Sequence, residues 1–247
     1  MVSIIPKGLK IKTDEKTAIS IILDAIKTQK PFAYTHYGDG EALVLQTLQN
    51  CPPDDSYMEG FYEKCKRYWG LDEDTALAVA QISVPIIESL VKSDMLGVAF
   101  KYGIPKNLLK FRSEVPVCHW LTLNNLSDPT KLDAFFQGKD VRLITSYGDK
   151  LRVSVQQRTK SNVAVTTIPF QMSLAEAQQA LHQIPDFPEP LVLWGCGGGL
   201  KNAGVFLRDK FGKTCLDVGS VLDAWAGVRC RPQYKEGGIW SHLVITP

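Results

Sequence analysis

Two acidic residues stand one residue apart in a turn that contains two glycines, the segment Tyr37-Gly38-Asp39-Gly40-Glu41. In extended or irregular backbone, residues two apart share a face, so both carboxylates can reach one point. The glycines let the backbone approach a ligand closely. Carboxylates on a turn are typical ligands of Mg²⁺ or Mn²⁺, which proteins often hold together with substrate phosphates. The pattern predicts a metal–diphosphate site; a plain surface turn is the structural alternative.

A second glycine-rich turn, Gly195-Cys196-Gly197-Gly198-Gly199, directly follows the apolar run 191–194. In parallel sheets, ligands bind at the carboxyl ends of strands, where such a turn would lie. Its backbone N–H groups and the following helix N-terminus favour a phosphate or pyrophosphate, and Lys201 would add positive charge. Asp217 stands near the end of the next strand, where a ribose-binding acid would lie, so NAD or S-adenosylmethionine remains an open alternative. A tight strand–helix connection is the purely structural reading.

The segment that follows, residues 217–229, carries several polar groups in an apolar setting. Asp217 and Asp223 lie on either side of a Gly-Ser helix start, and either could act as a general base for a hydroxyl nucleophile. Ser220 is a candidate helix N-cap, and Arg229 is a candidate phosphate ligand.

The elements that must position these residues alternate along the chain, which predicts a mostly parallel sheet with helices on both faces. A single domain over residues 1–247 is expected, with the aromatic-rich residues 50–71 as a lid, an acceptor-binding insertion or a part packed on the core. Pro85 is expected to kink or divide a helix. We expect strands at residues 31–36, 96–100, 141–145, 162–168, 191–194 and 214–218, and helices after the cap Thr13-Asp14 and at 41–48, 73–91, 131–136, 173–181 and 200–211.

Composition limits the class of protein. The chain has 247 residues, 45% of them hydrophobic and 22% charged, which is ordinary for a soluble globular protein. A net charge of +2 is too small to indicate a nucleic-acid or membrane-surface protein. Six cysteines without a C-x-x-C pair predict reduced thiols and no structural zinc. The sequence shows neither a signal-peptide core nor an apolar run of 18 residues, so a cytoplasmic protein without a transmembrane segment is expected.

The strand and its Tyr37–Glu41 turn resemble the R-[FY]-G-D-G-E motif of the GT-D-fold glycosyltransferases. The Gly195–Gly199 turn and the segment 216–227 resemble the C-terminal glycine-rich turn and the "LDIGS…DAWAG" segment of the same group. Residues 116–119 are a fainter match. This resemblance implies a Rossmann-like α/β fold, a UDP-sugar donor, and a divalent cation, Mn²⁺ or Mg²⁺, held by Asp39 and Glu41. His36 stands where the motif has arginine.

Such a glycosyltransferase would move a sugar to a glycan or another hydroxyl acceptor. Its general base would be Asp217, Asp223 or Asp149, among which the sequence does not choose. A nucleotide-sugar-binding protein without activity is an alternative, to which the His36 departure lends weight. A homo-oligomer is left open. Trp69, Trp120 and Trp240 are candidates for interface or acceptor stacking, and burial in the core is the commoner reason for such aromatic residues. The residues expected to contact the nucleotide sugar are His36, Gly38, Gly40, Gly195, Gly197, Gly198, Gly199, Lys201, Ser220 and Arg229.

Overall fold

The sheet is the framework of the molecule. The computed structural model describes residues 13–48, 75–99, 115–169, 173–229 and 231–245. These residues form a seven-stranded sheet in the order β3-β2-β1-β7-β6-β4-β5, in which every neighbouring pair is parallel. The strands are β1 (Phe32–Tyr37), β2 (Met95–Val98), β3 (Val117–His119), β4 (Val141–Thr145), β5 (Val163–Thr167), β6 (Leu191–Trp194) and β7 (Thr214–Asp217).

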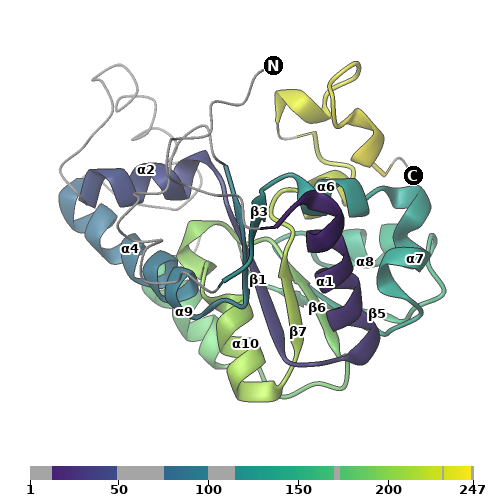
Figure 1. Cartoon of the computed structure of the whole chain (residues 1–247), viewed down its shortest axis with the longest axis horizontal. Coiled ribbons are helices and arrows are strands. Elements are labelled where there is room, and N and C mark those ends of the chain that lie inside the picture. Colours follow the sequence, from purple (N-terminus) through teal and green to yellow (C-terminus); the bar gives the residue numbers. More distant parts are fainter. Residues whose placement is uncertain (1–12, 49–74, 100–114, 170–172, 230, 246–247) are drawn as a thin grey trace.

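Helices cover both faces of this sheet, as the alternating pattern predicts (Figure 1). One face carries α1 (Glu15–Thr28), α6 (Thr122–Leu126), α7 (Leu132–Phe136), α8 (Gly148–Gln156) and α11 (Val221–Trp225). The other carries α2 (Asp39–Leu48), α4 (Thr75–Lys92), α9 (Leu174–His182) and α10 (Ala203–Phe211). The described residues also contain four short 3₁₀ helices: η1 (Pro129–Lys131), η2 (Gly198–Leu200), η3 (Pro232–Tyr234) and η4 (Ser241–Leu243).

The helix starts follow from capping residues. The Asp14 side chain accepts the backbone N–H of Thr17 at 2.9 Å, which fixes the start of α1. At the start of α9, Ser173 and Glu176 exchange the two bonds of a capping box. Both starts agree with the prediction from sequence.

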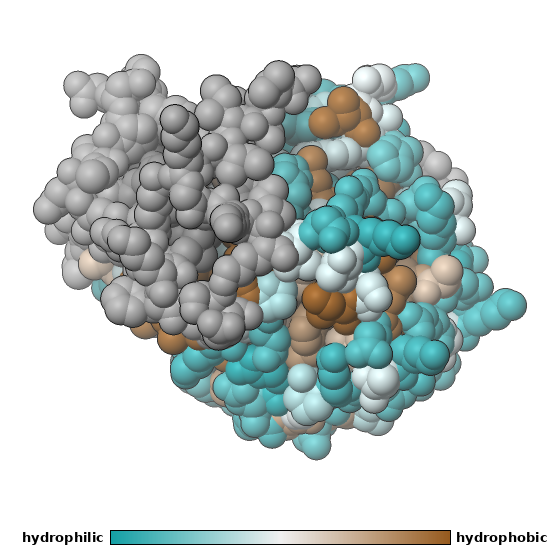
Figure 2. All heavy atoms as spheres, viewed as in Figure 1, coloured by the Kyte–Doolittle hydropathy of each residue, from teal (hydrophilic) through white to brown (hydrophobic). Residues whose placement is uncertain are grey.

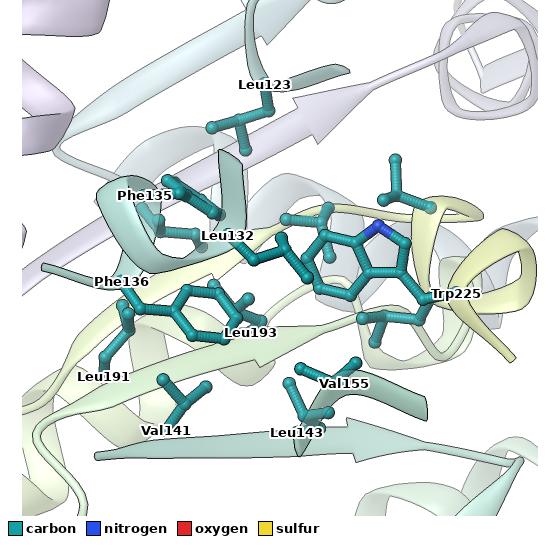
Figure 3. Packing of buried hydrophobic residues seen from close by; sticks show 14 of the residues in the cluster. Leu123, Leu132, Phe135, Phe136, Val141, Leu143, Val155, Leu191, Leu193 and Trp225 are labelled. Atoms are coloured by element: carbon teal, nitrogen blue, oxygen red, sulfur yellow. The ribbon is translucent and has the colours of Figure 1, made fainter. Parts of the chain in front are cut away.

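The two faces of the sheet bury different side chains. On the α1 face, Leu191 and Leu193 of β6 pack with Phe136 of α7 and Trp225 of α11, as Figure 3 shows. The Trp225 indole N–H donates to the carbonyl of Ser127 at 3.0 Å, so this large ring is buried with its polar atom satisfied. On the opposite face, neighbours along the same strands, among them Val192 and Trp194, pack against α9 and α10. This alternation buries both sides of each central strand.

Some expectations need correction. Helix α4 runs unbroken from Thr75 to Lys92 through Pro85, so the helix is not divided at this proline, and a kink there stays a prediction. Pro85 removes one N–H donor, but buried neighbours such as Ile82 and Ile86 anchor the helix on both sides of it. Helix α10 begins at Ala203 rather than at residue 200, because η2 occupies the preceding turn. The sequence did not predict β3 or α8, and residues 50–71 lie outside the described part of the chain.

Candidate functional site

The two glycine-containing turns predicted from sequence meet at the centre of the sheet. β1 pairs with β2 on one side and with β7 on the other, so the chain order reverses beside β1, where open parallel sheets bind ligands. A Cβ added to Gly195, after β6, would stand 2.2 Å from the carbonyl oxygen of Gly219, after β7. A Cβ on Gly219 would in turn stand 3.3 Å from Nδ1 of His36. The turns after β6 and β7 and the end of β1 are therefore in close contact, and glycine at 195 permits it.

A buried ion triad joins these turns. The Lys201 ammonium lies 2.9 Å from Oε1 of Glu41 and 2.8 Å from Oδ2 of Asp217. The side chains of Lys201, Glu41 and Asp217 are only 5%, 12% and 1% exposed, respectively. We call these three residues the Lys201 triad. It connects the first turn of α2, the segment between η2 and α10, and the end of β7.

The charges of the triad follow from burial and from contact. Burial alone would raise the pKa of Glu41, but the adjacent ammonium of Lys201 outweighs it and lowers this pKa to about 2. Burial would lower the pKa of Lys201, yet Asp217 and Glu41 raise it above its usual value. Burial raises the pKa of Asp217 in spite of the ammonium. Lys201 is thus a protonated cation beside an ionised Glu41.

The carboxylates of the triad have further donors. Oε2 of Glu41 accepts the backbone N–H of Gly38 at 2.9 Å. Glu41 is the third residue of α2, so this bond is one half of a capping box. Oδ2 of Asp217 also accepts the N–H of His36 at 3.2 Å, and Oδ1 accepts the N–H of Gly219 at 3.1 Å. Each oxygen of both carboxylates therefore has a donor from the chain itself.

This arrangement bears on the predicted metal site. Glu41 does not fit a metal ligand as it stands, because Lys201 and Gly38 hold its two oxygens. Asp39 is the first residue of α2. Within the ranges that the structure describes, no three or more His, Cys, Asp or Glu side chains gather as a metal site would require. Asp39 and Glu41 are the first and third residues of α2, so the expectation that they lie on an irregular turn is wrong, and helical residues two apart do not share a face. A metal held by both residues stays a prediction.

An aromatic cluster lies at the same edge of the sheet, around His36. The His36 ring stacks on Trp120, with centroids 5.3 Å apart and planes 10° from parallel. Trp120 meets Trp240 edge to face at 5.7 Å, and Trp240 contacts Tyr234 at 5.8 Å. Burial lowers the pKa of His36 to about 3, and its Nε2 has no hydrogen-bond partner among the described residues. His36 is therefore a neutral stacked ring where the family motif has a cation.

The other predicted residues lie around this centre. Asp223 is half-buried in the first turn of α11. Asp149, after β4, is 86% exposed and pairs with Arg152 at 3.0 Å. Ser220 does not cap α11; its hydroxyl bonds that of Tyr234 at 2.9 Å.

Arg229 and the second glycine turn make contacts within the protein. Arg229 donates to the carbonyl of Tyr234 at 3.2 Å. Gly197 has a positive φ of 76°, and Gly198 and Gly199 begin η2, which packs against α4 and α9. Tyr234 shares a hydrogen bond with Ser220 and accepts one from Arg229. Its part in this region was not predicted, because nothing in the sequence pairs it with them.

Comparison with known proteins identifies a family that the sequence matches. The model of a family described as a GT-D fold-like domain matches residues 13–225. A solved structure described as the highly conserved domain of unknown function 1792, with a distinct glycosyltransferase fold, is 17% identical. The likeness covers 89% of this chain and 81% of that one, with a TM-score of 0.49. No curated protein matches the chain. No helix in the described residues is both long and apolar enough to cross a membrane.

Proposed function

The chain belongs to the family of GT-D fold-like domains, and from this we propose that it is a glycosyltransferase, which takes a sugar from a UDP-sugar and transfers it to a hydroxyl of a glycan acceptor. The family match contains the three segments that meet at the carboxyl ends of the central strands, namely the end of β1 and the turns after β6 and β7. Their meeting is the observation that carries the proposal, because open parallel sheets bind ligands where the strand order reverses.

The chain offers groups suited to a diphosphate at this place. The N-terminus of α2 presents backbone N–H groups and the positive end of a helix dipole. The turn Gly195–Gly199 is the second source of backbone donors, and its Gly197 is exposed. When bound, a divalent cation would supply charge to the leaving diphosphate, and Asp39 is the residue we propose for it.

The acceptor hydroxyl needs a base, and the three acidic candidates differ in their surroundings. Asp217 is 1% exposed, and Lys201, His36 and Gly219 occupy its oxygens, so we propose a positioning role for it. Asp223 and Asp149 remain the candidates for the base, because both are more accessible.

A binding protein without activity is the second candidate. The neutral, stacked His36 in place of the motif arginine favours it, because a neutral ring cannot hold a phosphate as an always-charged fork does. This alternative predicts that UDP binds but that no sugar is transferred.

Calorimetric titration with UDP tests the binding step. We expect UDP to bind in the presence of Mn²⁺, and Asp39→Asn to weaken that binding while the melting temperature stays unchanged. NAD and S-adenosylmethionine serve as controls. Binding of either control without any response to UDP would contradict the proposal and move the ligand to the Gly195–Gly199 turn alone.

A further inference from the structure

The ammonium of Lys201 lies between two carboxylates. It contacts Glu41 and Asp217 at 2.9 and 2.8 Å, on the α4 and α10 face of the sheet. The rings of Tyr37 and Trp194 stand 5.9 and 5.8 Å from the same nitrogen. Two carboxylates and two aromatic rings thus surround one cation that the chain itself supplies.

We propose that Lys201 is the resident cation of Glu41 and Asp217, and that Glu41 is a positioning residue of the nucleotide site rather than a metal ligand. The part of this inference that concerns nucleotide affinity rests on the proposed function. The part that concerns the metal does not, because it can be measured without any nucleotide.

The first reason is the cost of displacement. For a metal to bind Glu41 at Oε1, the ammonium of Lys201 would have to leave a position where its side chain is 5% exposed. It would then lie buried beside a second cation, and a buried charge without a partner is strongly unfavourable. Exchange of Lys201 for a metal at this place is therefore disfavoured while Lys201 is present.

The second reason is the other carboxylate oxygen. Oε2 of Glu41 binds the N–H of Gly38, the residue before α2. A metal at Oε2 would break this bond and leave a buried donor unsatisfied at the start of the helix. Glu41 is thus held from both sides, by the helix start on Oε2 and by Lys201 on Oε1.

The triad has a clear positioning task. Glu41 belongs to the first turn of α2, Asp217 ends β7, and Lys201 lies between η2 and α10. The ion pairs therefore set the spacing between the α2 N-terminus and the turns after β6 and β7. These are the segments that we propose to contact the diphosphate, so the triad acts on the ligand through them.

Direct measurement of Mn²⁺ binding, with free Mn²⁺ followed by electron paramagnetic resonance, separates the two roles of Glu41. Even outer partners of metal ligands change metal affinity about 10- to 100-fold, so a true ligand must show at least that effect. We expect Glu41→Gln to weaken Mn²⁺ binding by no more than the roughly 100-fold limit of an outer partner, because Glu41 fixes the start of α2, where Asp39 lies. A loss of more than about 100-fold on Glu41→Gln, beyond the range of an outer partner, would overturn the proposal.

Removal of the lysine gives the converse test. Lys201→Ala frees both carboxylates, and we expect this variant to gain Mn²⁺ binding that Lys201→Ala with Glu41→Gln loses again. Failure to gain it in a folded variant would count against Lys201 as the resident cation. Where Lys201→Ala does not fold, the comparison of wild type with Glu41→Gln decides alone. If the wild type does not bind UDP, the proposed function fails, yet both Mn²⁺ comparisons keep their meaning.

Discussion

At the scale of single residues, the main feature of the site is a group of buried charged side chains. Lys201, Glu41 and Asp217 form ion pairs at side-chain exposures of 12% or less. Pairs of this kind add little net stability compared with apolar packing, but removal of one partner leaves the others uncompensated. The triad should therefore be sensitive to single substitutions and to pH.

Replacement of the lysine tests the first sensitivity. Lys201→Met keeps the length of the side chain but leaves Glu41 and Asp217 without their cation, so we expect a loss of about 3–5 kcal/mol in the free energy of unfolding. Urea denaturation at pH 7 measures it. Lys150→Met is the matched control, because Lys150 is an exposed lysine on α8 and should change stability little. Equal stability of Lys201→Met and wild type would contradict the triad.

The pKa of Glu41 makes the second prediction. This pKa is lowered from 4.5 to about 2 in the folded protein, so ionised Glu41 contributes stability that is present above pH 4.5. That contribution is lost as the pH falls from about 4.5 through about 2, because the unfolded chain takes up the proton first. In Glu41→Gln this part of the acid destabilisation should be missing. Unfolding free energies measured from pH 6 to pH 2 would refute this if both proteins gave parallel curves.

At the scale of elements, the site depends on how closely neighbouring turns approach. The β6 turn and the β7 turn touch where Gly195 faces the carbonyl of Gly219. This contact is backbone against backbone, so no side-chain rotation can relieve a larger residue at position 195. In the aromatic cluster the contacts are made by side chains instead. The ring of Trp120, the residue after β3, contacts His36 of β1 and Trp240 of the C-terminal segment.

Gly195→Ala tests the approach of the turns. Its Cβ would stand 2.2 Å from the Gly219 oxygen, so we expect the turns to separate at a cost of about 1–3 kcal/mol in stability and UDP binding to weaken. Gly199→Ala is the control in the same turn, since its Cβ would meet only a Leu174 methyl at 3.1 Å. Thermal denaturation and calorimetry compare the two. Equal effects of both substitutions would mean that the turn contact does not shape the site.

At the scale of the whole molecule, much of the architecture could be predicted from the sequence. Short apolar runs such as 141–145 and 191–194 have the composition of strands buried on both faces, and they form β4 and β6. β3 escaped prediction because it has three residues, too few for a pattern. α8 escaped because it starts at Gly148, with a positive φ of 53°, and has exposed polar residues along much of its length.

The site could be predicted only in part. Glycine and acidic residues at the ends of predicted strands indicated which turns belong to the site, because the residue preferences of a turn depend on only a few neighbouring residues. The pairing of Lys201 with Glu41 could not be predicted, since it depends on how the sheet brings distant segments together. The same holds for the stacking of His36 on Trp120, which explains how a neutral ring is accommodated at that position.

The described part of the surface carries exposed hydrophobic residues singly. Figure 2 shows hydrophobic side chains scattered between hydrophilic ones on the described part of one face. Large exposed hydrophobic residues among those described are Val84, Val91, Val153 and Ile239. Scattered hydrophobic residues are normal on soluble proteins. Polar, glycine-rich and aromatic groups therefore converge at the carboxyl ends of the central strands β1, β7 and β6.

The release of UDP from a panel of UDP-sugars, with Mn²⁺ present and with and without simple sugar acceptors, tests the central claim most directly. We predict that the wild-type protein releases UDP from at least one donor, faster with an acceptor, and that Gly195→Ala slows this release more than Gly199→Ala does. UDP that binds without any turnover across the panel would contradict the claim of a transferase and leave a nucleotide-sugar-binding protein.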